Sequence, residues 1–379
     1  MGNWKQKQRL IAESSLHMRK MTPNQLKDGY DFINYLLEYR RANKLHSTYI
    51  VGTEKAIEYN EDDRVFFNFK FDGTVTGRMS CSRYDAGDGN VKGVSMHTLP
   101  REAEVNVRRM FGAPEGYYFS TVDQSMMEVR VLSWISKELT MQKALIDKVD
   151  FHKYTASLIN AKPIEDITKL ERQIAKNVTF LIVFGGTAMT LSRKYGVPLH
   201  IAEKAMEDWF MVYEGVPQYI SFVHDFIMRN EFAYSLFGRK RHLPNVKSPN
   251  PKQVERALRQ GLNFTVQSAA SDIMMCSLLG IAQEFKSKGM KSRLIASVHD
   301  SGEFFIKEEE LEEAHKIIYH HMVHNPIMRD TFNIDIGVPF EIETLVGESF
   351  GDGVEMFFNE DGTPSNLNEV EEYLERRAA

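Results

Sequence analysis

Two runs of strand-forming residues in this chain each end in an aspartate. The runs are YYFSTVD at 117–123 and RLIASVHD at 293–300, and their β-branched and aromatic residues favour strands. Ser301 and Gly302 then offer a turn and residues 303–306 a return strand, so a hairpin is expected to carry Asp300 at its tip. An isolated aspartate at a strand end is more often a turn or cap residue. Two such carboxylates on rigid strands are, however, what a pair of Mg²⁺ ions about 3.5 to 4 Å apart requires.

A helix with clear signals at both ends is predicted between these runs. TKLE at 168–171 is a capping box, and the glycine pair at 185–186 ends the helix. Two cations and two aromatic residues recur every four positions: Arg172, Lys176, Phe180 and Phe184. Since four residues advance about 40° beyond one turn, these side chains share a broad face. An ordinary amphipathic helix shows similar spacing. Cations near a helix N-terminus gain nothing from the macrodipole, so phosphate binding is the favoured interpretation.

Taken in order, these segments resemble the motifs of family A polymerases, the DNA polymerase I type. The helix resembles motif B, DQSMMEVR at 123–130 resembles motif A, and VHD at 298–300 resembles motif C. Further similar segments are TGRMS at 76–80, the histidine segment DFH at 150–152, the minor-groove helix pattern at 263–267, and LHSTYI at 45–50, which resembles the end of the thumb. The similarity runs in order from about residue 30 to about residue 350.

The resemblance implies an α+β fold of the right-hand type, with a palm built on an antiparallel sheet, helical fingers and a partial thumb. The expected divisions are N-terminal helices with the thumb remnant at 1–52, palm with motif A at 53–151, fingers with motif B at 152–258, palm with motif C at 259–351, and an acidic C-terminal tail at 352–379. The implied reaction is attack of a primer 3′-hydroxyl on the α-phosphate of a dNTP, releasing pyrophosphate. The implied partners are primer–template DNA and dNTPs. The implied cofactor is two Mg²⁺ ions, with Mn²⁺ as the alternative.

The resemblance also implies a role for each matching residue. The implied metal ligands are Asp123, Asp300 and the backbone carbonyl of Gln124. The implied nucleotide contacts are Arg172 to the γ-phosphate, His152 to the β-phosphate, Lys176 to the α-phosphate region as a catalytic cation, and Phe180 and Phe184 to the nucleotide, with Glu128 closing the space beneath the sugar. The implied contacts to DNA at the primer terminus come from Arg78, Asn263, Gln267 and His299.

Simpler interpretations exist for several of these residues. Glu128 completes a capping-box pattern with Ser125 and could only begin a helix. Histidines such as His152 and His299 are commonly surface or core residues, and the 263–267 pattern is also that of a solvated helix stripe. The ordered set of motifs favours the functional interpretation.

The chain departs from the family pattern at three places. Motif C usually continues with glutamate, whereas Ser301 stands here and Glu303 follows two residues later. Because strand side chains alternate, Glu303 is expected on the face of Ser301, where it could compensate through water. Phe184 stands where the family has a tyrosine whose hydroxyl bonds the Glu128 position, and Leu181 stands where the family has glycine.

Two alternative functions remain open at this stage. A single-subunit RNA polymerase shares the motif B spacing, although Glu128 and the 76–78 segment argue against it. A catalytically silent DNA-binding subunit of a replication complex is suggested by Ser301 and by the reduced thumb. Retention of Asp123 and Asp300 argues against loss of the chemistry.

The charge distribution is uneven along the chain. The net charge is −5, and the segment from Asp352 onward carries eight acidic and two basic side chains. That tail is expected either to lack fixed structure or to bind a partner. The segment GRKRH at 238–242, which includes Arg239, suits contacts with DNA phosphates.

The similarity begins near the end of the thumb, and no exonuclease motif precedes Thr76. We therefore expect a split polymerase of phage type that works with a separate N-terminal polymerase subunit or a processivity factor; a fragment of a longer chain is the competing explanation. No secretion signal is recognised, and the apolar run at 178–184 is too short to span a bilayer. Two cysteines without metal-binding spacing fit a reducing compartment. The expected location is the cytoplasm of a bacterial or phage-infected cell, with no membrane partner.

Overall fold

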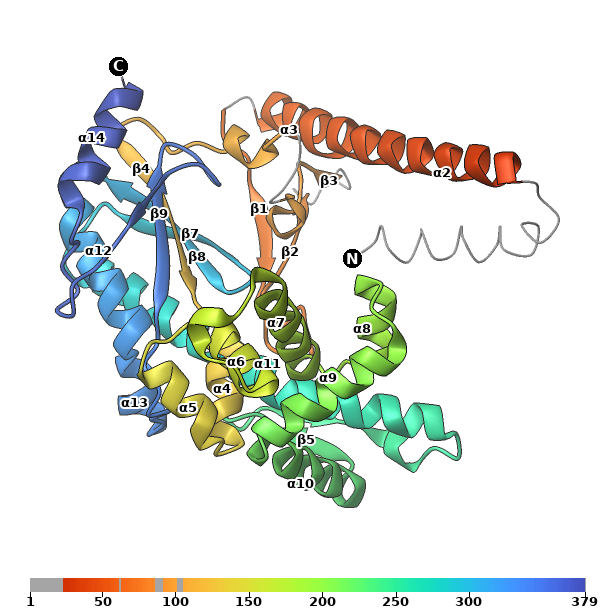
Figure 1. Cartoon of the computed structure of the whole chain (residues 1–379). Helices are drawn as coiled ribbons and strands as arrows, with labels where there is room; N and C mark the ends of the chain where they lie inside the picture. Colours follow the sequence, from red (N-terminus) through yellow and green to blue (C-terminus); the bar gives the residue numbers. More distant parts are fainter. Residues whose placement is uncertain (1–22, 61–62, 86–90, 101–104, 379) are drawn as a thin grey trace. The chain divides into compact units, whose positions relative to one another are not determined.

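The computed structural model describes residues 23–60, 63–85, 91–100 and 105–378. They belong to two compact units, whose elements are labelled in Figure 1. The first unit comprises Met1–Lys70 with Cys81–Val107, and the second comprises Phe71–Ser80 with Arg108–Ala379. The predicted palm segment 53–151 is therefore divided between the two units. The short segment that carries Arg78 belongs with the second, which also holds both aspartates.

The first unit joins helices to a small sheet. Its elements are α2 (Pro23–Lys44), the turn of helix η1 (Leu45–Ile50), α3 (Val51–Asn60), β1 (Phe67–Lys70), β2 (Ser80–Asp85), β3 (Val91–Lys92) and η2 (Met96–Thr98). The sheet has the order β1-β2-β3. Tyr49 of η1 is buried, and its hydroxyl donates to the carbonyl of Thr98 at 2.6 Å. This bond ties the helices to the chain that follows the sheet.

The second unit is built on a five-stranded antiparallel sheet in the order β10-β9-β4-β8-β7. The strands are β4 (Tyr117–Gln124), β7 (Arg293–Val298), β8 (Ser301–Lys307), β9 (Ile342–Gly347) and β10 (Val354–Met356). The antiparallel sheet and the mixture of helix and strand confirm the predicted α+β fold class. The hairpin also forms, but its turn was predicted two residues too late. Val298 pairs with Ser301, so the turn is His299 and Asp300, and His299 has a φ of 61°.

The two faces of this sheet differ because side chains alternate along each strand. On one face the buried residues of the strands, such as Val122, Phe304 and Val346, pack in one hydrophobic cluster with residues of α11 (Pro251–Ser287), α12 (Leu311–Tyr319) and α14 (Leu367–Ala378). The register places Asp123 beside Ser301, and both side chains therefore belong to the other face. The hydrophobic cluster thus fixes the sheet, while the opposite face carries polar groups near Asp123 and aromatic contacts of Phe119 with Phe305 toward its other end.

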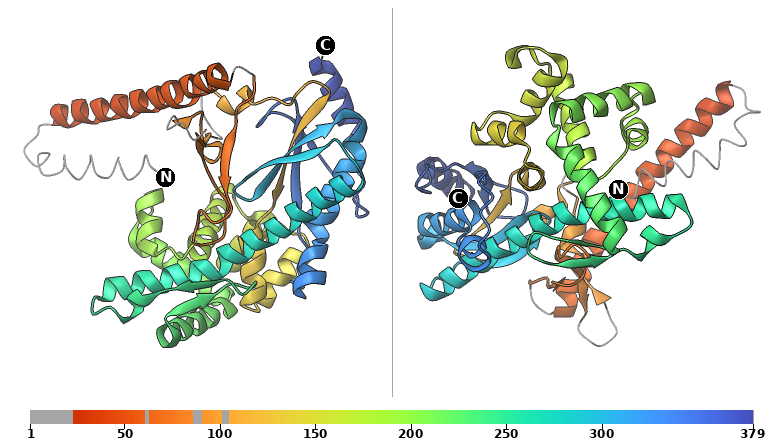
Figure 2. Two further views of the ribbon diagram at one scale, coloured as in Figure 1. Left: turned by 180° about the vertical axis from the view of Figure 1, so that it is seen from behind. Right: turned by 90° about the horizontal axis from the view of Figure 1, so that it is seen from below.

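Helices and one short hairpin form the rest of the second unit. They are η3 (Val107–Met110), α4 (Met127–Ile135), α5 (Leu139–Ile146), α6 (Phe151–Asn160), η4 (Ile164–Asp166), α7 (Lys169–Val183), α8 (Ala188–Tyr195), α9 (Leu199–Val212) and α10 (Gly215–Asn230), then the hairpin β5 (Phe232–Tyr234) and β6 (Lys240–His242), η5 (Pro244–Lys247), η6 (Glu308–Glu310), η7 (His320–His324) and α13 (Pro326–Phe332). Trp209 and Tyr213 lie at the centre of their core. The long helix α11 runs from these helices to the sheet (Figure 2).

The length and composition of α11 would allow it to cross a membrane, with a mean hydropathy of 1.3 in its most apolar window. However, 83% of that window is buried inside the protein. A core helix has these properties because its apolar residues face other parts of the same protein.

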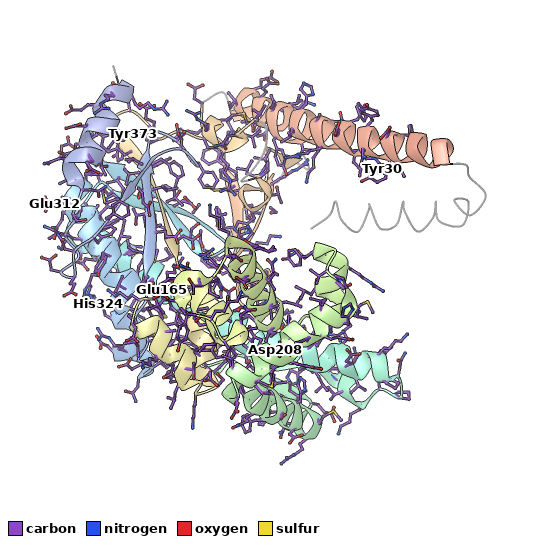
Figure 3. The ribbon with its side chains drawn as sticks, viewed as in Figure 1. Tyr30, Glu165, Asp208, Glu312, His324 and Tyr373 are labelled. Atoms are coloured by element: carbon purple, nitrogen blue, oxygen red, sulfur yellow. The ribbon has the colours of Figure 1, made fainter. Side chains whose placement is uncertain are left out.

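The acidic tail is folded, so the expectation that it lacks fixed structure is wrong. Strand β10 extends the sheet beside β9, and α14 packs against β10. Val370 and Leu374 of α14 are almost fully buried in the cluster beneath the sheet, and Tyr373 of the same helix is labelled in Figure 3. The acidic side chains lie on the solvent side of α14. Apolar burial at a helical spacing fixes this helix in spite of its charge.

We predict that Leu374→Ala destabilises the second unit by about 2 to 5 kcal/mol, because it leaves a cavity in a packed cluster. Urea unfolding followed by circular dichroism measures the change. The control is Glu375→Ala on the exposed face of the same helix, which is expected to change stability by less than about 0.5 kcal/mol. Equal unfolding midpoints for the Leu374 variant and the parent would contradict this packing role.

Candidate active site

The pairing of β4 with β8 brings the two predicted metal-binding aspartates together. Asp123 is paired with Ser301, the residue that follows Asp300. In addition, the backbone N–H of Gln124 donates to the carbonyl of Asp300 at 3.2 Å. The Gln124 side chain points away from this end of the sheet, because its amide donates to the carbonyl of Met322 at 2.9 Å. Only the backbone of Gln124 is therefore available to the site.

Arg78 joins this group from the segment that precedes β2. Its guanidinium donates to Asp300 Oδ1 at 2.8 Å and also to the carboxylate of Glu128. Gly77 holds the turn before it with a φ of 79°, a conformation that L-residues rarely adopt. A Cβ atom at Gly77 would lie 2.8 Å from the guanidinium of Arg239, so a larger residue there would also displace the end of that side chain. The sequence alone gave no sign that Arg78 pairs with acids.

Glu128 is an acid held inside the protein. The predicted capping box with Ser125 does not form: α4 begins after Met126, whose φ is 52°, and no side chain caps its start. The Glu128 side chain instead reaches Arg78. Burial raises the pKa of Glu128, the nearby charge of Asp300 raises it further, and Arg78 opposes both effects.

Glu303 lies beneath the aspartates on the same face of the sheet, as expected from strand alternation. It is fully buried, with Oε1 2.7 Å from the Ser301 hydroxyl, while the Thr121 hydroxyl donates to Oε2 at 2.5 Å. Burial raises the pKa of Glu303 to about 7, the hydrogen bonds and Arg108 oppose this, and Asp123 adds to it. Ser301 and Glu303 contact each other directly, and compensation by Glu303 through water for the missing third carboxylate stays a prediction.

The helix α7 forms as predicted, including both bonds of the capping box between Thr168 and Glu171. Phe180 of this helix and Phe184, which follows its last residue, stack with their ring planes 12° apart. Arg172 donates to Asp150 at 2.7 Å, and Asp150 itself caps the start of α6. The helix therefore presents aromatic rings that are packed against each other and a cation with an acidic partner.

His152 on α6 belongs to the same group of side chains. Its ring lies 5.6 Å from that of Phe180, and its Nδ1 is buried without a hydrogen-bond partner among the described residues. Burial lowers the pKa of His152 to about 4, and the charges of Lys176 and Arg172 lower it as well. A neutral imidazole that feels the charges of two cations is suited to a site for an anionic ligand, which would offset their repulsion.

Several residues predicted to contact DNA have partners within the second unit. Asn263 on α11 donates to the carbonyl of Phe184 at 2.7 Å, at the end of α7. Gln267 lies one turn further along α11 and is half-buried. Arg239 forms an ion pair of 2.7 Å with Asp272. His299 is exposed in the hairpin turn beside Asp300.

Two acidic partners in the site were missed by sequence analysis. Asp150 was noted only as part of the histidine segment, although its position before a helix start is a recognisable capping signal. Asp272 is a single acid within the long apolar part of α11, and such an isolated charge is a sign of a buried pair. Neither signal identifies which arginine is the partner, because that depends on how the helices pack.

The donor set at Asp123 and Asp300 fits a hard cation with few protein ligands. No group of three or more histidine, cysteine or acidic side chains in the described parts of the chain is arranged to hold a metal. Mg²⁺ usually keeps several waters and is held by one or two carboxylates together with substrate phosphates. Two aspartates and a backbone carbonyl provide this kind of partial site.

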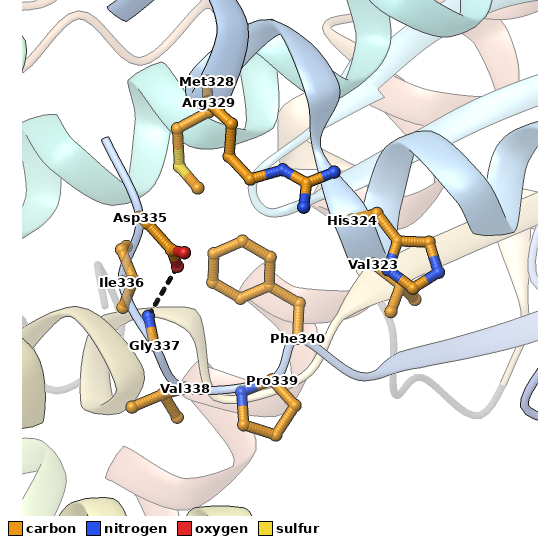
Figure 4. A pocket seen from close by; sticks show the side chains of 10 residues that line it. All are labelled: Val323, His324, Met328, Arg329, Asp335, Ile336, Gly337, Val338, Pro339 and Phe340. Atoms are coloured by element: carbon orange, nitrogen blue, oxygen red, sulfur yellow. Dashed lines mark hydrogen bonds between the residues drawn. The ribbon is translucent and has the colours of Figure 1, made fainter. Parts of the chain in front are cut away.

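A separate pocket lies beside α13 and the segment at 335–340 (Figure 4). Met328 and Phe340 contribute apolar surface, and Arg329 contributes a cation. Asp335 accepts a hydrogen bond from the backbone of Gly337 at 2.9 Å. None of the predicted site residues lines this pocket.

Comparisons with known proteins find related sequences and a similar fold. The family model described as DNA polymerase family A matches residues 4–352. DNA polymerase I of Pseudomonas aeruginosa is 26% identical over 85% of this chain and 33% of its own length, and that of Bacillus subtilis is 28% identical over 86% and 35%. The chain thus spans about a third of the length of these relatives. The POL domain of Pol1 from M. smegmatis, solved in complex with a DNA primer-template and dNTP, has a TM-score of 0.75 and 25% identity, covering 87% of this chain and 56% of that one.

We predict that Glu303 makes stability depend on pH. Because its pKa is raised from 4.5 to about 7 in the folded protein, the folded state binds more protons than the unfolded state between these values. Stability should therefore fall as the pH rises through this window and then remain level.

The measurement is urea unfolding of the parent and of Glu303→Gln at pH 5 and pH 8, with a chelator present. Glutamine does not titrate, so the stability of the variant relative to the parent is expected to improve by about 2 to 3 kcal/mol between the two pH values. If the stability of Glu303→Gln differs from that of the parent by the same amount at both pH values, the raised pKa of Glu303 is contradicted.

Proposed function

Because the chain belongs to DNA polymerase family A, we propose that it catalyses template-directed DNA synthesis from dNTPs on primer–template DNA. The observation that carries this proposal is the pairing of β4 with β8, which brings Asp123 and Asp300 to one end of the sheet. The helix α7, with its cations and aromatic rings, belongs to the same compact unit and contacts α4, which carries Glu128. The second unit thus holds both the acidic groups that would bind metal ions and the basic groups that would bind phosphates.

The nucleotide would be held by residues of α6 and α7. Arg172 would exchange its contact with Asp150 for the γ-phosphate, since a guanidinium can bind a phosphate through two donors. Lys176 would lie at the α-phosphate region and His152 would donate to the β-phosphate. Phe180 and Phe184 would provide the surface on which the base stacks. The buried unpaired Nδ1 of His152 supports an anionic ligand here.

Family A polymerases generally use divalent metal ions, and we propose two Mg²⁺ ions held by Asp123, Asp300 and the carbonyl of Gln124. Such ions activate the attacking hydroxyl and stabilise the leaving oxygen. The chain orients the two carboxylates by fixing them on paired strands, so that little reorganisation is needed when cations bind. Mn²⁺ is the alternative ion, because it accepts the same oxygen ligands.

The primer terminus would be positioned by Arg78, His299, Asn263 and Gln267, and Arg239 would contact the DNA backbone. Support comes from their placement: two lie on α11, and two lie at or beside Asp300. Minor-groove acceptors occupy similar positions in all correct base pairs, so such donors can test pairing without reading sequence.

We also propose a separate N-terminal polymerase subunit or processivity factor as a partner. The supporting observation is the exposure of large aromatic side chains along α2, with Tyr35 69% and Phe32 66% exposed, and Tyr30 is labelled in Figure 3. Exposed apolar patches of this kind often mark protein interaction sites.

A cytoplasmic site of action is consistent with the free thiols of Cys81 and Cys276.

We predict that Asp300→Asn lowers primer extension by about a hundredfold or more, because a neutral amide is a poor ligand for a hard cation. Single-turnover extension with Mg²⁺ and dNTPs measures the loss. The matched control is Asp225→Asn, which removes an exposed carboxylate from α10 and should retain extension. Full extension by the Asp300 variant would contradict the role of Asp300 as a metal ligand, whereas no extension by the parent would favour the catalytically silent subunit.

We predict that Glu128→Ala raises incorporation of rNTPs relative to dNTPs by about tenfold to a hundredfold, since a steric contact of this size discriminates over that range. The expected reason is that Glu128 closes the space that a 2′-hydroxyl would occupy. Competition assays with both nucleotide types measure the ratio. A parent enzyme that already prefers rNTPs would support the RNA polymerase alternative.

A further inference from the structure

We propose that Arg78 is an internal counter-cation of the active site, which occupies Asp300 until an acceptor on the primer terminus withdraws it and allows a divalent cation to bind. This inference rests on the proposed function, because it assumes that Asp300 is a metal ligand. It adds an order of events that the function itself does not require. DNA would bind first, and the cation at Asp300 would follow.

The geometry places one donor atom between two acids. Arg78 NH2 donates both to Asp300 Oδ1, at 2.8 Å, and to Glu128. The side chains of Arg78 and Asp300 are 26% and 30% exposed, whereas that of Glu128 is 6% exposed. The contact with Glu128 is thus the sheltered one, and the contact with Asp300 is the one that ligands can reach.

The charge balance makes this contact incompatible with a metal at the same oxygen. A guanidinium and a divalent cation repel each other at short range, and both would compete for the lone pairs of Asp300. A cation can therefore bind Asp300 fully only when Arg78 moves away. Glu128 already accepts a hydrogen bond from the same nitrogen of Arg78. It therefore offers Arg78 no additional acceptor when a cation takes the place of Arg78 at Asp300.

A second observation indicates that Arg78 awaits another acceptor. Its Nε is buried and has no hydrogen-bond partner among the described residues. An unsatisfied buried donor costs free energy, and an acceptor supplied by a ligand would remove this cost. The backbone around Arg78 is fixed, because the Thr74 hydroxyl donates to its carbonyl at 2.7 Å and Gly77 packs against Arg239. The side chain, not the loop, is expected to move.

The test measures Mn²⁺ binding in the absence of DNA and nucleotide, by the loss of the free-ion signal in electron paramagnetic resonance. Arg78→Gln is expected to bind Mn²⁺ about fivefold more tightly than the parent, because a competing cation is removed. Arg78→Lys keeps the charge and is expected to stay near the parent. The control Arg109→Gln removes an exposed arginine paired with Asp352 at 2.8 Å and is expected to leave Mn²⁺ affinity unchanged.

Primer–template DNA provides the second arm. It is expected to tighten Mn²⁺ binding to the parent about fivefold and to change binding to Arg78→Gln much less, because the variant has no counter-cation to withdraw. Equal or weaker Mn²⁺ affinity of Arg78→Gln without DNA would overturn the proposal, provided that its unfolding midpoint matches that of Arg78→Lys. If the glutamine variant is unstable, the parent alone decides: a Mn²⁺ affinity of the parent that does not change when DNA is added would overturn the proposal.

Asp300→Asn separates failure of this inference from failure of the proposed function. If Mn²⁺ binding is lost in Asp300→Asn but Arg78→Gln binds like the parent, only the counter-cation role is contradicted. If Asp300→Asn binds Mn²⁺ as the parent does, with and without DNA, Asp300 is not a ligand and the proposed function loses its main support.

Discussion

The antiparallel pairing of β4 with β8 is the interaction on which the site depends. A shift of one residue in this register would turn Asp123 from the polar face of the sheet toward the hydrophobic cluster that contains Val122. The buried residues of the opposite face prevent such a shift, because Phe304 and Ile306 would then be exposed. The position of the acids is therefore fixed by apolar packing on the side of the sheet that they do not face.

Charge is distributed in pairs throughout this site. Asp300 and Glu128 share Arg78, Asp150 pairs with Arg172, and Asp272 pairs with Arg239. Glu303 differs from these pairs, because it is fully buried with two hydroxyl groups around its carboxyl and a raised pKa. Without bound ligands the cations would otherwise repel one another, so internal acids hold them where phosphates and nucleic acid would later provide negative charge.

Local sequence patterns were sufficient to predict the helix and the strands whose limits depend on neighbouring residues. The limits of α7 follow from its capping box and its glycines, and both strands that carry the aspartates were located from β-branched and aromatic residues. The hairpin turn was misplaced because Ser301 and Gly302 look like turn residues, yet Gly302 lies in a strand where a Cβ atom would meet Leu278 at 2.7 Å. The pairing of Arg78 with Glu128 and Asp300 could not be predicted, since it depends on tertiary contacts between residues far apart in the chain. The fold of the tail was missed because its charge was given more weight than the spacing of Val370 and Leu374.

Helix α11 contributes to three hydrophobic clusters of the second unit. Its residues Leu262, Ala270 and Leu278 belong one to each cluster, so none of the clusters can lose its packing without changing the surroundings of the same helix. Melting one end of a continuous helix leaves the remaining end with fewer neighbours and a new frayed terminus. The thermodynamic consequence is cooperativity: the three clusters are expected to unfold in a single transition, because they share one continuous helix.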